Sequence, residues 1–380
     1  MATAPDNAPR GVLPDEWPMF VAMGAFAFLS VALAILVRTW SDAVFITHFP
    51  ASWLSLFFIV SAFAFAPTTV AYAALARRVA LVRLNTGALG LFAVVALACV
   101  GASGKWSVFA AALVLAIVSP LTNVAAWSTI LERLDSRQAR RLIPLIGGVG
   151  TAGAVGGGSL GAWLVDRWGT GALLWAVVAV LLVMLPFPRW VTAGQPDRPT
   201  RRPADPGFAE GWRALGKNRL LRVVGAATFL MAVGTNLTDY LLKARLQVEL
   251  APEQIALFFA WFHSLTNVAV LAFQFLVVAP AVHRLGISRS FSAHPAVVLG
   301  GALLCVVSPS LIAAVALRSA DTLLKFTFHS STQDLVVTPV PQVERTQAKV
   351  FLKGIVYPLG GLTAGLLIPL VALAGPWAAP

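Results

Sequence analysis

The sequence predicts an all-α polytopic membrane protein built from two pseudo-symmetric helical bundles. Hydrophobic residues make up 58% of the 380 residues and charged residues only 12%, about half the charged share of a soluble domain. Apolar runs long enough to cross a bilayer recur along the whole chain. Helices are the expected structure because lipid offers the backbone no hydrogen-bond partners.

The apolar runs give about eleven expected membrane spans. They cover residues 18–37, 52–76, 84–102, 106–131, 142–165, 172–190, 220–242, 254–278, 292–308, 311–335 and 348–373. Cys99 and Cys305 both fall inside these runs, so we expect them to be small core residues rather than disulfide partners or metal ligands.

The net charge of +12 is concentrated in alternate loops. Arginine and lysine gather after the second, fourth and sixth expected spans and in two later loops on the same side. This bias places the N-terminus in the cytoplasm. Membrane insertion accounts for the basic character, so the lipid bilayer is the expected partner and nucleic acid is not.

The chain divides at residues 191–219, which are rich in proline, glycine and charge and predict a cytoplasmic linker. A tail (1–16) and a six-helix bundle (17–190) precede the linker, and a bundle of about five helices (220–380) follows it. Short matches recur at an offset of 201, GAFAFL at 24–29 with GAATFL at 225–230 and LFF at 56–58 with LFF at 257–259. They indicate a duplication, which is typical of transporters. A twelfth helix would complete the second half; it is expected to be missing or truncated, with the C-terminus outside.

A glycine-rich run, LIGGVGTAGAVGGGSLGAW, occupies residues 145–163 within the fifth expected span. A phosphate-binding loop would need a strand before the glycines. Gly153, Gly157 and Gly161 instead share one helix face, which predicts close packing of a second helix or a hinge.

Three titratable residues form a stripe in the tenth expected span. Asp321, Lys325 and His329 lie at i, i+4 and i+8, and therefore on one helix face. Charge at this depth is costly unless it is paired or faces a cavity. Three interpretations follow: a structural Asp321–Lys325 ion pair, a cavity-facing Lys325 that binds an anionic substrate, and a proton relay through Asp321 and His329. For His329, a helix contact through hydrogen bonds is the favoured interpretation.

Other polar residues near the ends of expected spans are candidates for binding or gating. Arg38, Lys243 and Arg318 could reach the interface by extending their side chains. Asp239 and Lys243 repeat the acid-then-base spacing, and Asp239 lies 201 residues after Arg38, which predicts a gate or ion pair between the bundles. The polar groups of the eighth span are predicted either to line a cavity or to form contacts between helices. They are His263, Asn267 and Gln274.

Three stretches resemble one known family. They are LVRTWSDAVFITHFPAS (36–52), TDYLLKARLQVELAPEQIALFFAWFHSLTNVAVLAFQF (238–275) and HSSTQDLVVTPVPQVERTQAKVFLKGIVYPLGG (329–361). They look like bacterial proteins similar to the ATP/ADP (NTP/NDP) nucleotide exchange transporters. The resemblance implies a major facilitator-like fold in the bacterial inner membrane and a substrate role for Lys349. The sequence departs from the family pattern at Lys353 and Pro358, where an acidic residue and an arginine are typical.

The leading functional prediction is a secondary transporter that works by alternating access and exchanges an organic anion such as a nucleotide. No ATP-hydrolysing P-loop sequence is present, no cofactor is expected, and no catalytic constellation indicates an enzyme. The alternatives are a transport-inactive scaffold or regulator and a proton-coupled transporter of another small molecule. The candidate substrate-binding residues are Lys325, Asp321, Arg38, Asn267, Gln274, His329 and Lys349.

Overall fold

The computed structural model confirms an all-α membrane protein. It describes residues 12–76, 78–193 and 208–373, except for 330–331, 333–335, 338–339, 342–343, 345–347 and 349–350. Ten helices in this described part are long and apolar enough to cross a membrane. The first ten predicted spans each correspond to a helix, although the tenth is described without a gap only as far as His329, and the eleventh corresponds to the last helix.

The first bundle contains seven helices, two of which share one crossing. They are α1 (Trp17–His48), α2 (Leu54–Ala76), α3 (Leu81–Val100), α4 (Lys105–Arg133), α5 (Ser136–Trp168), α6 (Ala172–Met184) and α7 (Phe187–Val191). α5 begins at an N-cap, Asp135, whose carboxylate accepts the backbone N–H groups of Gln138 and Arg137 at 2.8 Å. These hydrogen bonds hold the pKa of Asp135 below its usual value.

The second bundle follows a short helix within the predicted linker. That short helix is α8 (Phe208–Lys217), and the helices that the structure describes in the bundle are α9 (Arg219–Glu249), α10 (Pro252–Phe273), α11 (Ala279–Val307), α12 (Leu311–Leu324) and α15 (Tyr357–Leu373). Three π-helical turns extend this set, η3 (Gln274–Val278), η4 (Lys325–His329) and η5 (Leu352–Val356). Gly286 bends α11 with a φ of 77°, so the apolar part of this helix starts later, at Arg289.

Two helices are longer than predicted, and this changes where their charged residues lie. α1 continues to His48 rather than ending near residue 37, and α9 continues to Glu249 rather than ending near residue 242. Arg38 and Lys243 are therefore interior residues of their helices. The interpretation that their side chains reach the membrane interface is wrong, because both side chains pair with carboxylates inside the molecule.

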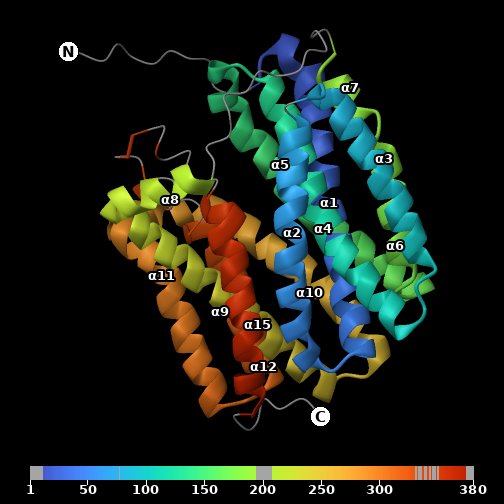
Figure 1. The fold of residues 1–380 in the computed structure, drawn as a ribbon, viewed down its shortest axis with the longest axis vertical. Helices are drawn as coiled ribbons and strands as arrows, with labels where there is room; N and C mark the ends of the chain where they lie inside the picture. Colours follow the sequence, from blue (N-terminus) through green and yellow to red (C-terminus); the bar gives the residue numbers. More distant parts are fainter. Residues whose placement is uncertain are drawn as a thin grey trace.

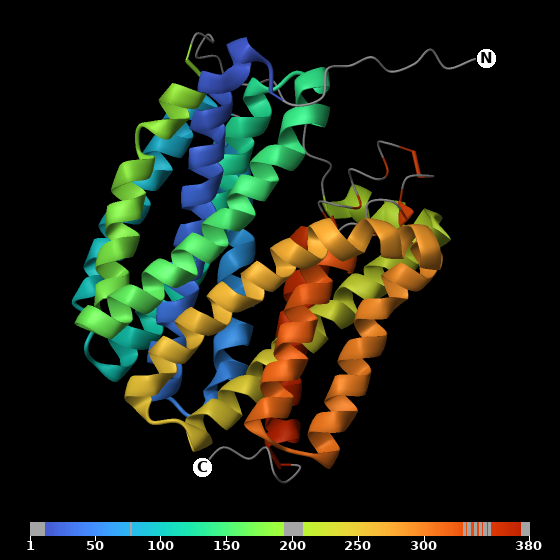
Figure 2. The same cartoon turned by 180° about the vertical axis from the view of Figure 1, so that it is seen from behind.

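The two bundles meet at one end of the molecule and diverge toward the other (Figures 1 and 2). We call the end where α1 finishes at His48 the closed end. There the side chain of Gln247 on α9 accepts the N–H of Ala51 at 2.8 Å and donates to the carbonyl of Ile46 at 2.7 Å and of Phe49 at 2.8 Å. Ser55 on α2 donates to the carbonyl of Gly365 on α15 at 2.6 Å. Backbone atoms of one bundle are thus held by side chains of the other.

Glycines of α5 let helices approach closely on two faces. A Cβ at Gly153 would overlap the backbone of Phe28, and one at Gly157 would lie 2.6 Å from the carbonyl oxygen of Ala32, both on α1. The packing interpretation of these glycines is confirmed. Gly158 faces the other bundle, where a Cβ would lie 2.8 Å from the Cα of Ser264 on α10.

Candidate functional site

A cavity of about 810 Å³ lies between the bundles. Both bundles contribute to its wall through α1, α2, α4, α5, α9, α10 and α12. Most lining side chains are apolar, among them Phe45, Phe57, Phe262 and Phe326. Along α1 and α10 the lining extends from the closed end toward Val31 and Gln274. This size and composition are typical of a small-molecule site.

A few polar side chains interrupt the apolar wall. Three of them carry amides, Asn123 on α4, Asn267 on α10 and Gln274 at the start of η3. The amide of Asn267 donates to the carbonyl of His263 at 2.7 Å, which leaves its oxygen free to accept. The predicted residues Asn267, Gln274 and Arg38 therefore converge on one cavity.

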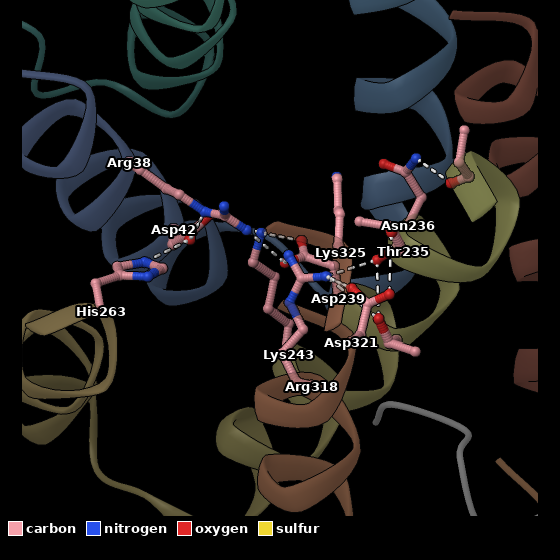
Figure 3. Close-up of polar contacts among 12 residues, drawn as sticks. Arg38, Asp42, Thr235, Asn236, Asp239, Lys243, His263, Arg318, Asp321 and Lys325 are labelled. Carbon is pink, nitrogen blue, oxygen red and sulfur yellow. Dashed lines mark hydrogen bonds and ion pairs between the residues drawn. The ribbon is translucent and has the colours of Figure 1, made fainter. Parts of the chain in front are cut away.

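An ionic network joins the two bundles at the level of Arg38, and three of its members, Arg38, Asp42 and Lys243, also line the cavity (Figure 3). Asp42 of α1 accepts Lys243 Nζ from α9 at 2.7 Å, and Lys243 also reaches Asp239 at 2.6 Å. Arg38 lies 3.4 Å from both Asp42 and Asp239. The predicted contact between Arg38 and Asp239 is present. The ion pair between bundles with the shorter distance is Asp42–Lys243.

Arg318 extends the network into the second bundle. Its guanidinium contacts Asp239 at 2.8 Å and Asp321 at 2.9 Å, and it also donates to the carbonyl of Thr235 at 2.9 Å. Arg318 is only 3% exposed, so the expectation that it extends to the membrane interface is wrong. Three cations, Arg38, Lys243 and Arg318, thus face three carboxylates, Asp42, Asp239 and Asp321. Such balance is needed because an unpaired charge in a low-dielectric interior is expensive.

The predicted ion pair between Asp321 and Lys325 does not form. Asp321 is fully buried and binds Arg318, the hydroxyl of Thr235 at 3.1 Å and Nε2 of His294 at 3.0 Å. Lys325 instead donates to the hydroxyl of Tyr357 on α15 at 2.9 Å. The stripe does share one face, but that face points into the second bundle, because the cavity is lined by the neighbouring positions Thr322 and Phe326.

The remaining predicted residues lie apart from the cavity wall. His329 is 3% exposed and stacks on Phe291, with ring centroids 5.1 Å apart. The expectation that it forms hydrogen bonds between helices is wrong, because neither ring nitrogen has a partner. Lys349 lies outside the described residues.

The structure brings three further residues into the site. Asp42 binds Arg38, Lys243 and His263, the last at 3.4 Å. His294 and Tyr357 hold Asp321 and Lys325. A signal for Asp42 was present in the sequence, because it follows Arg38 at i+4 on the same helix face. No local pattern marks His294 or Tyr357, which come from other helices.

Neither the family models nor the curated proteins contain a match to this sequence. Solved structures do match. A crystal structure of the nucleoside transporter NupG has a TM-score of 0.67 at 15% identity and covers 92% of this chain and 89% of its own. A POT family transporter in complex with 5-aminolevulinic acid gives 0.68 at 12% identity, covering 93% and 91%. A bacterial homolog of the human lysosomal transporter Spinster, inward-facing and unoccupied, gives 0.61 at 16% identity, covering 96% and 84%.

These similarities define the class of the molecule. The chain is a polytopic membrane protein with a major facilitator-like fold, as predicted. Identities of this size support the fold alone, so they do not test the resemblance to nucleotide exchangers. Within the described residues, no group of three or more His, Cys, Asp or Glu side chains is placed to hold a metal ion.

Proposed function

We propose that this protein is a secondary transporter that carries a small organic anion by alternating access. The observation that carries the proposal is the cavity between two bundles, closed at one end by side chains that pair across them. A site that both halves contribute to, with irregular helical turns beside it, is the arrangement that major facilitator-like transporters use. The positive-inside bias of the loops supports a periplasmic closed end and, with it, an inward-facing state.

Arg38 is the group that we propose to bind the anion. Its side chain is 38% exposed, whereas those of Lys243 and Asp42 are only 5% and 11% exposed. Its two ionic contacts are long, at 3.4 Å, and a guanidinium has five N–H donors. Several donors therefore remain for a carboxylate or a phosphate group, which arginine binds with two parallel hydrogen bonds. The side-chain amides of Asn123 and Gln274 and the amide oxygen of Asn267 would bind the polar part of the same molecule.

The cavity distinguishes this proposal from a transport-inactive scaffold. A protein that had kept only the fold would be expected to fill its interior with phenylalanine and leucine. Here open space of about 810 Å³ adjoins buried charges, and maintaining buried charges costs stability. A binding function accounts for both features.

Exchange of nucleotides is the specific form of the proposal to be tested first. The purified protein would be reconstituted in liposomes loaded with unlabelled ATP, and entry of labelled ADP and ATP would be measured. Wild type would be compared with Arg38→Ala and Lys325→Ala. We expect exchange to fall at least about tenfold in Arg38→Ala, because this variant loses a charged hydrogen bond to the substrate. Exchange should change less in Lys325→Ala, because Lys325 already donates to the hydroxyl of Tyr357.

Two outcomes would contradict the proposal at different levels. Loss of exchange in Lys325→Ala with retention in Arg38→Ala would move the binding group into the second bundle. If folded wild type exchanges no nucleotide, the substrate is another anion. Binding of smaller carboxylates and phosphomonoesters, measured by thermal shift, would then be compared between wild type and Arg38→Ala. A wild type that no anion stabilises would rule out the anion-transport proposal.

A further inference from the structure

A second titratable cluster lies behind the cavity wall, within the second bundle. It consists of Asp321 on α12, His294 on α11 and His329 on the π-helical turn η4. All three are buried, with 0%, 2% and 3% of their surfaces exposed. None of them lines the cavity, so the binding of a substrate there does not explain why they are retained.

The contact between His294 and Asp321 needs a proton. Nε2 of His294 lies 3.0 Å from Oδ1 of Asp321, a hydrogen-bond distance at which one of the two atoms must donate. The other ring nitrogen, Nδ1, is buried and has no partner. A second proton could therefore be added to His294 without breaking any existing hydrogen bond.

His329 adds two more unsatisfied nitrogens beside this pair. Its ring lies 5.7 Å from that of His294 between centroids, and it stacks on Phe291. Neither Nδ1 nor Nε2 has a hydrogen-bond partner. Buried polar atoms are nearly always paired, and leaving them unpaired costs free energy. Each of the two rings therefore has a nitrogen that could take up a proton without breaking a hydrogen bond.

Charged and titratable groups lie beside the cluster and further along the helices packed against it. Arg318 binds the second oxygen of Asp321 at 2.9 Å, and Lys325 lies one turn further along, on the hydroxyl of Tyr357. The neighbouring helices present the titratable groups Asp239 and Lys243 from α9, His263 from α10 and Tyr357 from α15. Arg318 connects the cluster to the bridge between bundles because it also binds Asp239.

We propose that Asp321, His294 and His329 form a proton-binding site that controls the closed end through Arg318. Without the additional proton, three carboxylates hold the three cations of the network, as the structure shows. A proton taken up by the cluster adds one positive charge to that region. Arg318 then loses part of its attraction to Asp321 and competes with Lys243 and Arg38 for the two carboxylates that remain.

The direction of the effect follows from this charge balance. Asp42–Lys243 and Asp239–Arg38 are ion pairs that cross between bundles. Stronger competition for their carboxylates weakens both, so acid conditions favour opening of the closed end. A proton and an anionic substrate would accordingly favour each other's binding, by the reciprocity of linked equilibria.

The test measures the closed end directly and needs no substrate. Spin labels would be placed on Ser103→Cys in the first bundle and Ser308→Cys in the second. Both positions are exposed and follow helices that finish at the closed end. The native Cys99 and Cys305 are buried and would be replaced by alanine. Distances between the labels would be measured in nanodiscs by double electron–electron resonance from about pH 8 to pH 4, which extends below the range in which histidine usually titrates.

We expect the label separation to increase on acidification of the parent protein. His329→Gln, which loses no hydrogen bond, should remove or displace this response. Asp321→Asn resembles the protonated carboxyl group and should give the longer separation at every pH. The matched control is His48→Gln, an exposed histidine at the last residue of α1, which should respond as the parent does. Size-exclusion chromatography would establish that each variant is folded. If Asp321→Asn does not fold, the pH response of His329→Gln alone decides the test.

Three results would overturn the proposal. One is a label separation independent of pH in the parent protein. The second is an unchanged response in folded His329→Gln and His294→Gln. The third is a response lost only in His263→Gln, which would assign the proton to the histidine beside Asp42. The inference rests on one part of the proposed function, that the closed end opens. If no transported anion were found, the pH dependence of the label separation would still test the inference.

Discussion

Lys243 is the residue on which both bundles most depend at the closed end. Its ammonium group lies within 2.7 Å of Asp42 and 2.6 Å of Asp239, one carboxylate from each bundle. The side chain is only 5% exposed, so solvent cannot replace either contact. A buried ion pair is weak support for stability as a whole, but the removal of one partner leaves the other charge uncompensated.

Lys243→Met should therefore destabilise the closed end strongly. Methionine keeps the length of the side chain and removes its charge, which leaves two buried carboxylates to share Arg38 and Arg318. We expect a cost of about 3–5 kcal/mol, measured as a lower Tm in detergent. The control is Lys217→Met, an exposed lysine at the end of α8, which should melt as wild type does. Equal melting temperatures for both variants would show that the network contributes nothing to holding the bundles together.

A charge reversal at Arg38 and Asp239 should fail to restore function. The sequence offset alone suggests a simple pair, in which Arg38→Asp with Asp239→Arg would recover what each single variant loses. In the structure Asp239 also binds Lys243 and Arg318, so an arginine there would face two cations. We expect the double variant to be no more active in liposome transport than Asp239→Arg alone. Recovery to at least half of wild-type transport would show that the two residues act as an isolated pair.

Residue-scale reasoning from the sequence was correct about the faces and wrong about the partners. Helical periodicity placed Asp321, Lys325 and His329 on one face, and they do share it. It could not show that Arg318, three residues earlier, and His294, from another helix, would compete for Asp321. An i, i+4 pair contributes only a few tenths of a kcal/mol on its own, so partners from other helices decide the pairing.

At the scale of elements, the crossing of α5 and α10 sets how closely the bundles approach. Gly158 contacts the backbone of Ser264, and the nearby hydroxyls of Ser159 and Ser264 lie 3.0 Å apart. Because the obstructing atoms include backbone, the neighbour cannot rotate away. This contact lies between bundles, unlike those of Gly153 and Gly157 with α1.

Gly158→Ala should separate α5 from α10. We expect a cost of about 1–3 kcal/mol, as for other overpacked sites, seen as a lower Tm together with easier opening of the closed end. The control is Gly87→Ala on α3, where an added Cβ meets nothing within 4 Å and alanine favours the helix. If Gly158→Ala matches or exceeds wild type in Tm, this crossing does not limit the approach of the bundles.

Hydropathy predicted the existence of the helices better than their ends. The apolar run of α1 finishes near residue 37, yet the helix continues through Arg38 and Asp42 to His48. Polar residues end a hydropathy window, whereas a helix ends where its backbone loses its hydrogen bonds. Arg38, Asp42 and Lys243 lie in these unpredicted extensions of α1 and α9, which is why their burial was missed.

At the scale of the whole molecule, the repeat in the sequence predicted two bundles, and the structure contains them. Residues 201 apart meet at the closed end, Arg38 with Asp239 and Ile46 with Gln247. The sequence could not give the cavity or the state of its two ends, because these depend on how the bundles are tilted. That tilt is determined by contacts between residues far apart in the chain.

The arrangement of loops makes a final prediction about orientation in the membrane. Ser103, in the loop between α3 and α4, lies at the closed end, and Ala193, just after α7, lies at the opposite end; both are exposed. The excess of arginine and lysine on the Ala193 side predicts that this side is cytoplasmic. In a background without Cys99 and Cys305, Ser103→Cys should react with a membrane-impermeant maleimide in intact spheroplasts. Ala193→Cys should react only after the membrane is permeabilised.

The reverse pattern would make the closed end cytoplasmic, and the structure would then be outward-facing. Labelling of both cysteines in sealed spheroplasts would mean that the chain inserts in two orientations. The charge bias would then be too weak to select one of them.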